Sequence, residues 1–261
     1  MTPTVKNRLR NQVWSILPSY LDSFVESLDG AAGLQGLLER APLQGFDRRG
    51  SIALIPIQGA LGKRLDGFER NVLGMTDYDD IDAALTLAQV DDSVEKILLH
   101  IDSPGGSVTG LAELGRAVKQ SQKPVFAYTD SLMASAAYHI GSQASAVYSS
   151  ESAFVGSIGA RIVHVEQSGM LEKLGITVSA FGKGQHKLDH SPFRPLSQDE
   201  AADLQAMVDE SHAEFRAVVE SARSVDPIVF ESKTYRGAQA VELGLTDGVL
   251  NSLSEALTFL G

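Results

Sequence analysis

The sequence predicts an α/β fold in which short buried strands alternate with helices along most of the chain. Three patterns support this prediction: short apolar runs of strand length, segments with apolar residues at helical spacing, and glycine-containing turns between them. A chain of 261 residues can form one large domain, or one domain with a small appendage.

The first 48 residues differ from those that follow. Apolar residues recur at helical spacing from Trp14 to Leu28, and two glycines then interrupt the pattern. We therefore expect an N-terminal helical extension over residues 1–48, packed on the main body or on a neighbouring subunit. The main domain is expected over residues 49–261.

The main domain begins with strands and helices in alternation. Ile81, Leu85 and Ala88 mark a helix for which Thr76 or Asp77 can serve as the N-cap. We expect strands at residues 52–57, 97–101, 125–128 and 146–148, and further helices from about residue 108 and near residues 134–142.

The later part of the chain is less regular. Apolar residues predict strands near residues 162–165 and at residues 176–181, and a long helix carries apolar residues on one face from Leu204 to Val219. Residues 182–197 between them are polar and contain glycine and proline, so we expect a loop. Long ordered loops on such scaffolds often carry function.

Composition excludes several classes of protein. The net charge of -11 disfavours nucleic acid or a membrane surface as the main partner. The chain has no cysteine, and its six histidines are scattered, so neither a disulfide framework nor a metal site is expected. No apolar stretch is long enough to span a bilayer, and no signal-peptide core is evident. We expect a cytoplasmic protein without a cofactor.

Two short segments could carry chemistry. Gly105 and Gly106 follow a predicted buried strand, and backbone N–H groups exposed there could bind a developing negative charge as an oxyanion hole. The alternative is a tight turn that needs positive φ. Ser135 lies among alanines at the start of a short predicted helix, where another group could approach its hydroxyl. Taken alone, this serine is typical of helix packing.

Taken together, the motifs resemble the signal peptide peptidase family of serine proteases, which shares the fold of Clp protease and crotonase. The likeness covers residues 51–250. It is carried by five segments in order, namely DSPGGSV (102–108), LMASAAY (132–138), VGSIGA (155–160), KGQHKLDHSPFRPLS (183–197) and RGAQAVELGLTDGV (236–249). The resemblance implies a Clp protease/crotonase-like superhelix of repeated ββα units.

The resemblance also implies a catalytic apparatus. It assigns Ser135 as nucleophile and Lys187 as general base, Gly105 and Gly106 as oxyanion donors, and Ser157 as a residue that orients the lysine. A lysine can accept the proton of a serine only when it is neutral, which requires its pKa to fall from about 10.4 toward 7–8. Burial lowers a lysine pKa in this way, so the working site must be desolvated.

Alternatives to this site remain open. Lys183 is a rival base, and His186 or His190 with Asp189 could form a Ser-His-Asp triad. Ala136 and Ala137 stand where many family members have glycines, which predicts a narrower approach to the serine. Leu132 and Met133 could line a substrate pocket or the core.

The biological role follows from the resemblance alone. The N-terminal extension and the missing membrane anchor resemble phage-encoded members that act as head maturation proteases on capsid or scaffold proteins, in the host cytoplasm or procapsid. A peptidase for signal-peptide remnants or cytosolic peptides is an alternative. A crotonase-like acyl-CoA enzyme and a non-catalytic assembly protein are alternatives from other classes. Relatives form rings, some with serine and lysine from neighbouring protomers, so a homo-oligomeric ring is expected.

Overall fold

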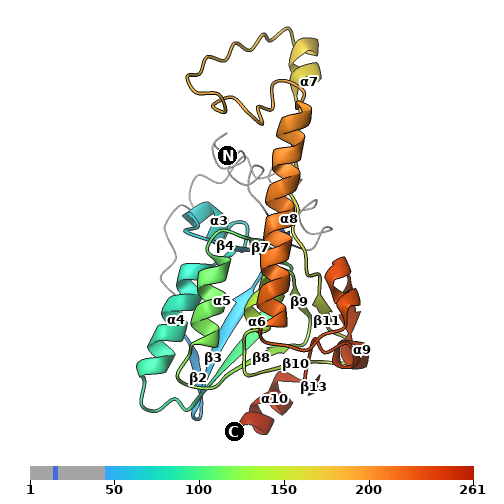
Figure 1. The fold of residues 1–261 in the computed structure, drawn as a ribbon. Helices are drawn as coiled ribbons and strands as arrows, with labels where there is room; N and C mark the ends of the chain where they lie inside the picture. Colours follow the sequence, from blue (N-terminus) through green and yellow to red (C-terminus); the bar gives the residue numbers. More distant parts are fainter. Residues whose placement is uncertain (1–13, 17–44) are drawn as a thin grey trace.

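A six-stranded, mainly parallel sheet forms the centre of the molecule (Figure 1). The computed structural model describes residues 14–16 and 45–261. Neighbouring strands of the sheet are parallel except that β2 is antiparallel to β3. The strand order is β13 (Gly248–Val249), β10 (Ala146–Ser149), β8 (Val125–Thr129), β6 (Lys96–Asp102), β3 (Ile52–Gln58) and β2 (Asp47–Arg49).

A second layer of short strands gives the fold its repeat. Four strands of the large sheet are each followed by a short strand outside it, and three of these pairs then lead into a helix. The short strands are β4 (Leu61–Gly62), β7 (Gly105–Ser107), β9 (Leu132–Ala134) and β11 (Phe154–Gly156), and the helices are α4 (Tyr78–Val90), α5 (Leu111–Lys119) and α6 (Ala136–Gly141). This succession confirms the predicted ββα repeat.

The short strands belong to two small sheets. In one, β7 lies between β4 and β1 (Trp14–Ile16), with β5 (Thr76–Asp77) beyond β4. In the other, β11 lies between β9 and β12 (Thr234–Arg236). The remaining elements are α3 (Gly67–Asn71), α7 (Ser168–Lys173), α8 (Gln198–Glu220), the 3-10 helix Pro227–Glu231, α9 (Gly237–Glu242) and α10 (Leu253–Leu260).

Both faces of the large sheet are covered, which is why its strands read as nearly continuous apolar runs. Ile55, Ile57 and Ile97 contribute to the main core, which also contains residues of α4, α5 and α6. Leu54 and Leu98 belong to a second core on the α10 side. Asp77 caps α4, as predicted, by accepting a hydrogen bond from the amide of Asp79.

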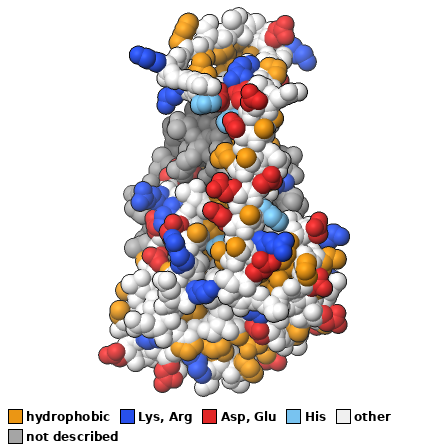
Figure 2. Space-filling view, viewed as in Figure 1, with side chains coloured by type: hydrophobic (Ala, Val, Ile, Leu, Met, Phe, Trp, Pro, Cys, Tyr) orange, Lys and Arg blue, Asp and Glu red, His pale blue; other side chains and the backbone are white. Residues whose placement is uncertain are grey.

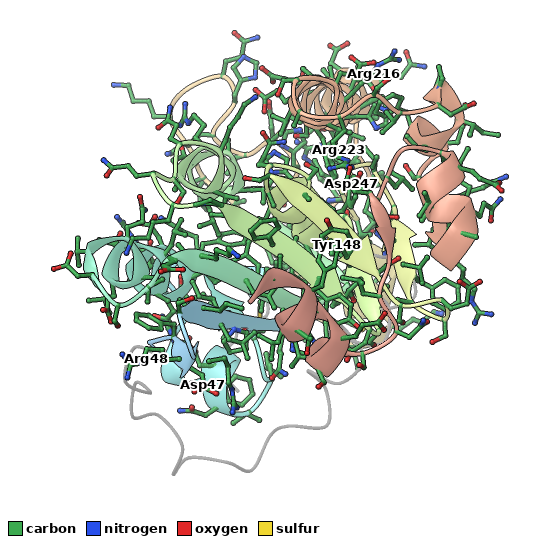
Figure 3. The ribbon with its side chains drawn as sticks, turned by 90° about the horizontal axis from the view of Figure 1, so that it is seen from below. Asp47, Arg48, Tyr148, Arg216, Arg223 and Asp247 are labelled. Atoms are coloured by element: carbon green, nitrogen blue, oxygen red, sulfur yellow. The ribbon has the colours of Figure 1, made fainter. Side chains whose placement is uncertain are left out.

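Helix α8 packs on the body only near its C-terminal end. Phe215 and Val219 are buried there, whereas Met207 is exposed. Beyond the helix, Arg223 pairs with Asp247 at 2.8 Å, and Asp247 also accepts from the amide of Val147 (Figure 3). These bonds fix the end of α8 to strand β10 and to the turn before β13.

The N-terminal part of α8 projects from the body together with the segment that precedes it (Figure 1). We call residues 161–197 the arm. The strands predicted near residues 162–165 and at residues 176–181 are wrong, because these arm residues have no strand conformation and Phe181 is 93% exposed. Figure 2 shows hydrophobic side chains among charged ones along α8 and in the arm.

Most of the predicted N-terminal extension, residues 1–13 and 17–44, lies outside the described residues. At Trp14–Ile16 the helical prediction is wrong, since these residues form strand β1 against β7. Backbone pairing with an available strand edge outweighs side-chain periodicity at this position.

Candidate active site

Ser135 occupies a strained turn between β9 and α6. Its backbone has φ 55° and ψ −121°, a conformation that costs a residue with a side chain about 1–3 kcal/mol. The residue is only 1% exposed. Such strain at a strand-to-helix turn is a common way to present a nucleophile, because it holds the hydroxyl at the end of the strand.

The segment after β11 surrounds this turn. The amide of Ser135 donates to the carbonyl of Gly156 at 2.7 Å, and its hydroxyl lies 3.5 Å from the carbonyl of Gly159. Ser157 lies between Gly156 and Gly159 in the sequence. It is buried and, like Ser135, has a positive φ, at 53°. The structure therefore brings two of the predicted residues, Ser135 and Ser157, into one buried corner.

The two glycines of β7 contact the same region. Strand β7 packs against α6, and Ser103, just before β7, exchanges backbone hydrogen bonds with Leu132 and Ala134 of β9. A side chain at position 106 would be excluded, because a Cβ there would lie 2.0 Å from the carbonyl oxygen of Leu61.

Gly105 combines the two interpretations that the sequence left open. Its φ of 99° requires glycine, as a tight turn would. Its amide donates to the hydroxyl of Ser103 at 3.2 Å, so it would have to exchange this bond in order to bind an oxyanion.

Lys187 lies far from Ser135 within one chain. Helix α6 contacts α8 near Phe215, whose ring centroid is 5.2 Å from that of His139, whereas Lys187 lies in the arm before the other end of α8. The helix from Gln198 to Phe215 is about 25 Å long at 1.5 Å per residue. Lys187 is exposed, so residues 14–16 and 45–261 do not provide the burial that a working lysine base requires.

The arm also holds the other candidate bases. Lys183 is exposed, like Lys187. His186 lies 2.7 Å through Nδ1 from a carboxylate oxygen of Asp189, which is the pairing that the triad alternative requires. Glu200, in the first turn of α8, fixes this part of the arm by accepting from two nitrogens of Arg194 and from the amide of His190.

A hollow of about 360 Å³ lies between α5, α6 and α8. Its wall includes Ala160, which follows Gly159, and His139, one helical turn after Ser135, so it lies close to the candidate nucleophile. The rest of the wall is mainly apolar, from residues such as Leu111, Phe215 and Val218. The sequence patterns do not predict this hollow, although the position of His139 four residues after Ser135 places the two residues one helical turn apart.

The residues on either side of Ser135 are buried. Leu132 and Met133, for which the sequence left a substrate pocket or the core open, are buried, and Met133 belongs to the main core. Ala136 and Ala137 are fully buried and belong to the main core, so their methyl groups contribute to its packing. All four residues are buried because β9 and α6 lie inside the body.

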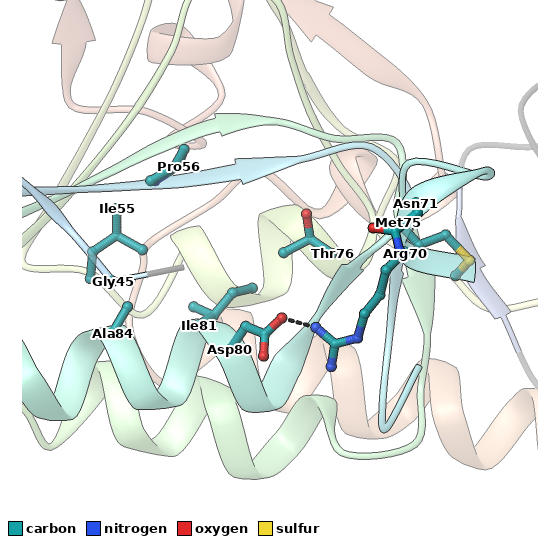
Figure 4. A pocket seen from close by; sticks show the side chains of 10 residues that line it. All are labelled: Gly45, Ile55, Pro56, Arg70, Asn71, Met75, Thr76, Asp80, Ile81 and Ala84. Atoms are coloured by element: carbon teal, nitrogen blue, oxygen red, sulfur yellow. Dashed lines mark hydrogen bonds and ion pairs between the residues drawn. The ribbon is translucent and has the colours of Figure 1, made fainter. Parts of the chain in front are cut away.

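Another hollow, of about 100 Å³, lies between α4 and the end of α3 (Figure 4). Arg70 in its wall forms ion pairs with Asp77 and Asp80 and donates to the carbonyl of Leu65. Because its guanidinium is used in this way, the hollow offers no strong site for an anionic ligand.

Within residues 14–16 and 45–261, no group of three or more histidine, aspartate or glutamate side chains is arranged to hold a metal ion. Among these same residues, no helix combines the length and the apolar character needed to cross a membrane.

Comparison with known proteins supplies independent evidence. The model of peptidase family S49 matches residues 117–259, and that of Clp protease matches residues 68–152. The two matches include the segments of Ser135, Ser157 and Lys187 and, in the Clp match, Gly105 and Gly106. The Clp match agrees with the ββα repeat described above.

Individual relatives cover different shares of the chain. The head-tail preconnector protein GP5 of Enterobacteria phage P21 is 33% identical over 214 residues, 80% of this chain and 42% of the relative. The capsid assembly protease C of Escherichia phage lambda is 32% identical over 214 residues, 80% of this chain and 48% of the relative. A protein of Methanocaldococcus jannaschii named as a protease is 36% identical over 165 residues, 61% and 53% respectively. The chain thus spans about half the length of these curated relatives.

Proposed function

The chain belongs to peptidase family S49, and on this premise we propose that it is a serine endopeptidase whose nucleophile is Ser135. The observation that carries the proposal is the strained, buried turn of Ser135 beside β7 and the segment 156–159. Attack of Oγ on a peptide carbonyl would transfer the serine proton to a base and give a tetrahedral intermediate. Departure of the protonated amine leaves an acyl-enzyme, which water then hydrolyses.

We assign Lys187 as the base, acting on Ser135 of a neighbouring protomer. The distance along α8 supports this assignment, because one chain cannot use both residues in a single site as described. The exposed apolar residues of the arm support it too, since docking on a second copy would bury them and would desolvate the lysine amine. The exposed set comprises Val163, Val165, Met170, Leu174, Ile176, Val178, Phe181, Leu188 and Phe193.

In this arrangement Gly106 and, after exchange of its bond to Ser103, Gly105 donate to the oxyanion, and Ser157 orients the incoming amine. The hollow beside His139 takes an apolar side chain next to the cleaved bond, because its wall is mainly apolar. A closed ring satisfies all protomers equally, since each gives its arm to one neighbour and receives one from the other.

Mixing two inactive variants tests the arrangement. Ser135→Ala and Lys187→Ala should each abolish hydrolysis of labelled casein, and Lys183→Ala should not. When the two inactive variants are co-assembled in equal amounts, about a quarter of the sites should receive both wild-type residues, as in a ring with shared sites. If the mixture stays inactive while its subunits exchange, the site does not lie between protomers.

The base is tested separately. His186→Ala breaks the pair with Asp189 but keeps the lysine, so hydrolysis should persist. If His186→Ala is inactive and Lys187→Ala is active, the histidine pair is the base. Covalent labelling of Ser135 with a serine-directed phosphonate in the wild-type chain distinguishes a peptidase from a non-catalytic assembly protein. An acyl-CoA enzyme would keep its activity in Ser135→Ala.

The relatives named as head-tail preconnector and capsid assembly proteins suggest the substrate class. We propose that the chain cuts a scaffold or capsid protein, in the host cytoplasm or the procapsid. Co-expression with the capsid and scaffold proteins of the same genome should yield shortened products with the wild-type chain and none with Ser135→Ala. Cleavage of signal-peptide fragments instead would support the alternative peptidase role.

A further inference from the structure

Strand β1 occupies the edge of β7 that β4 leaves open. Trp14 lies opposite Ser107, Ser15 opposite Gly106 and Ile16 opposite Gly105, in antiparallel register. The other edge of β7 pairs with β4, where Leu61 lies opposite Gly106. Both edges of this glycine-containing strand are therefore taken, one of them by a segment from the N-terminal part of the same chain.

Strand β7 lies close to the turn that carries Ser135. Ser103, which precedes β7, bonds to Ala134, the residue before Ser135, and β7 itself contacts α6. A peptide whose carbonyl is bound by the amides of Gly105 and Gly106, as in the proposed function, lies against β7 when it reaches Ser135. An extended peptide binds a free strand edge through main-chain hydrogen bonds, with little demand on its sequence. Strand β1 makes this type of pairing, so a substrate and β1 would need the same backbone groups.

We propose that Trp14–Ile16 is an internal competitor of the peptide substrate, held on the edge of β7 until a substrate displaces it. The proposal rests on the proposed function of Ser135 and adds regulation to that site. A strand of three residues makes few hydrogen bonds, so it is held weakly enough to be replaced. If the edge is open in about a tenth of the molecules, the apparent affinity for peptide is about tenfold weaker than that of the open edge.

Trp14 provides a direct readout, because it is the only tryptophan of the chain. The full-length Ser135→Ala protein is titrated with a synthetic peptide of residues 11–20 that carries Trp14→Phe, so that all tryptophan emission comes from the protein. Binding of the peptide, followed by calorimetry, should change the emission of Trp14 with the same midpoint. An emission that stays constant at saturation would contradict displacement of β1.

Two further variants on the same background measure the competition. Ser15→Pro/Ile16→Pro removes two successive amides, one of which points toward β7 because successive amides alternate in a strand. This variant should bind the peptide about tenfold more tightly. The matched control Ser15→Ala/Ile16→Val keeps both amides and should bind like the parent. Equal affinities in the two variants, or no binding in either, would overturn the proposal.

Casein hydrolysis separates this proposal from the proposed function. With Ser135 present, the proline variant should show a lower KM and an unchanged kcat, as expected when an internal competitor is removed. If neither chain cuts casein but the peptide still displaces Trp14, the peptidase assignment fails and the internal competitor is supported. If the chain cuts casein with the same KM in both variants, the peptidase stands and the internal competitor is refuted.

Discussion

His139 should make the folded protein sensitive to acid. Its ring is 4% exposed and packs against Phe215, with α5 so close that a Cβ on Gly115 would lie 2.8 Å from the imidazole. Burial lowers the pKa of His139 to about 4, from 6.5 in an unfolded chain. The Nδ1 atom is buried without a hydrogen-bond partner, so nothing on that side stabilises a charged ring.

The sign of the effect follows from proton binding. Above pH 6.5 the ring is neutral in both states, and His139 contributes no pH dependence. As the pH falls through 6.5, the unfolded chain binds a proton that the folded chain does not bind until about pH 4, so the stability falls. At 1.36 kcal/mol per pH unit, this group lowers the free energy of unfolding by about 2–3 kcal/mol at pH 4.5 and by about 3–4 kcal/mol at most.

Urea unfolding of the wild-type chain and His139→Phe at pH 7.5 and 4.5 measures this contribution. Phenylalanine keeps an aromatic ring against Phe215, and the adjoining hollow leaves room for its larger volume. Other titrating groups change both proteins equally, so the wild type should lose about 2–3 kcal/mol more than the variant on acidification. Equal losses in the two proteins would refute the assignment of a neutral, buried imidazole.

Three further predictions concern the site. Ser135→Gly should be inactive, like Ser135→Ala. In thermal unfolding it should be about 1 kcal/mol more stable than Ser135→Ala, since glycine tolerates the positive φ and alanine does not. Equal stabilities would show that the turn is not strained. Gly106→Ala should lower the free energy of unfolding in urea by about 1–3 kcal/mol, because the new methyl group meets the carbonyl of Leu61. It should also reduce casein hydrolysis at least tenfold. A fully active variant would show that β7 is not part of the active site. Glu200→Gln should lower kcat, because the carboxylate holds Arg194 and His190 of the arm. The urea midpoint of the body should change little, because α8 begins outside the core. An unchanged kcat would show that this contact does not position the base.

The sequence was sufficient where local pattern and burial agree. The run at residues 52–57 predicted β3, and the helix marked by Ile81 and Leu85 is α4, with the expected cap at Asp77. These elements are predictable because their apolar faces pack on nearby elements of the same chain. Ser135 was singled out by the family resemblance and not by its local residues, which alone are typical of helix packing, and its backbone strain could be seen only in the structure.

The wrong predictions share a different cause. A periodic pattern of apolar residues does not specify which other segment or surface they contact. Trp14 fits a helical spacing, but its backbone pairs with β7, some ninety positions along the chain. The apolar run at residues 176–181 resembles a buried strand, yet among the described residues Ile176 and Phe181 are exposed. An apolar pattern indicates that a segment tends to be buried, but not which surface buries it.

For Lys187, the sequence motif predicts the catalytic role but does not specify which serine lies next to the lysine. The motif around it pairs it with Ser135, while the fold of one chain places the two at opposite ends of most of α8. An amine that must lose its proton near neutral pH needs burial, and the arm that carries it is rich in exposed apolar side chains. A docking surface for the arm on a second copy would supply the burial, the desolvation and the serine in one step. The chemistry of the base therefore requires the same contact that the exposed apolar residues of the arm require, and this is the strongest reason to look for the complete site between protomers.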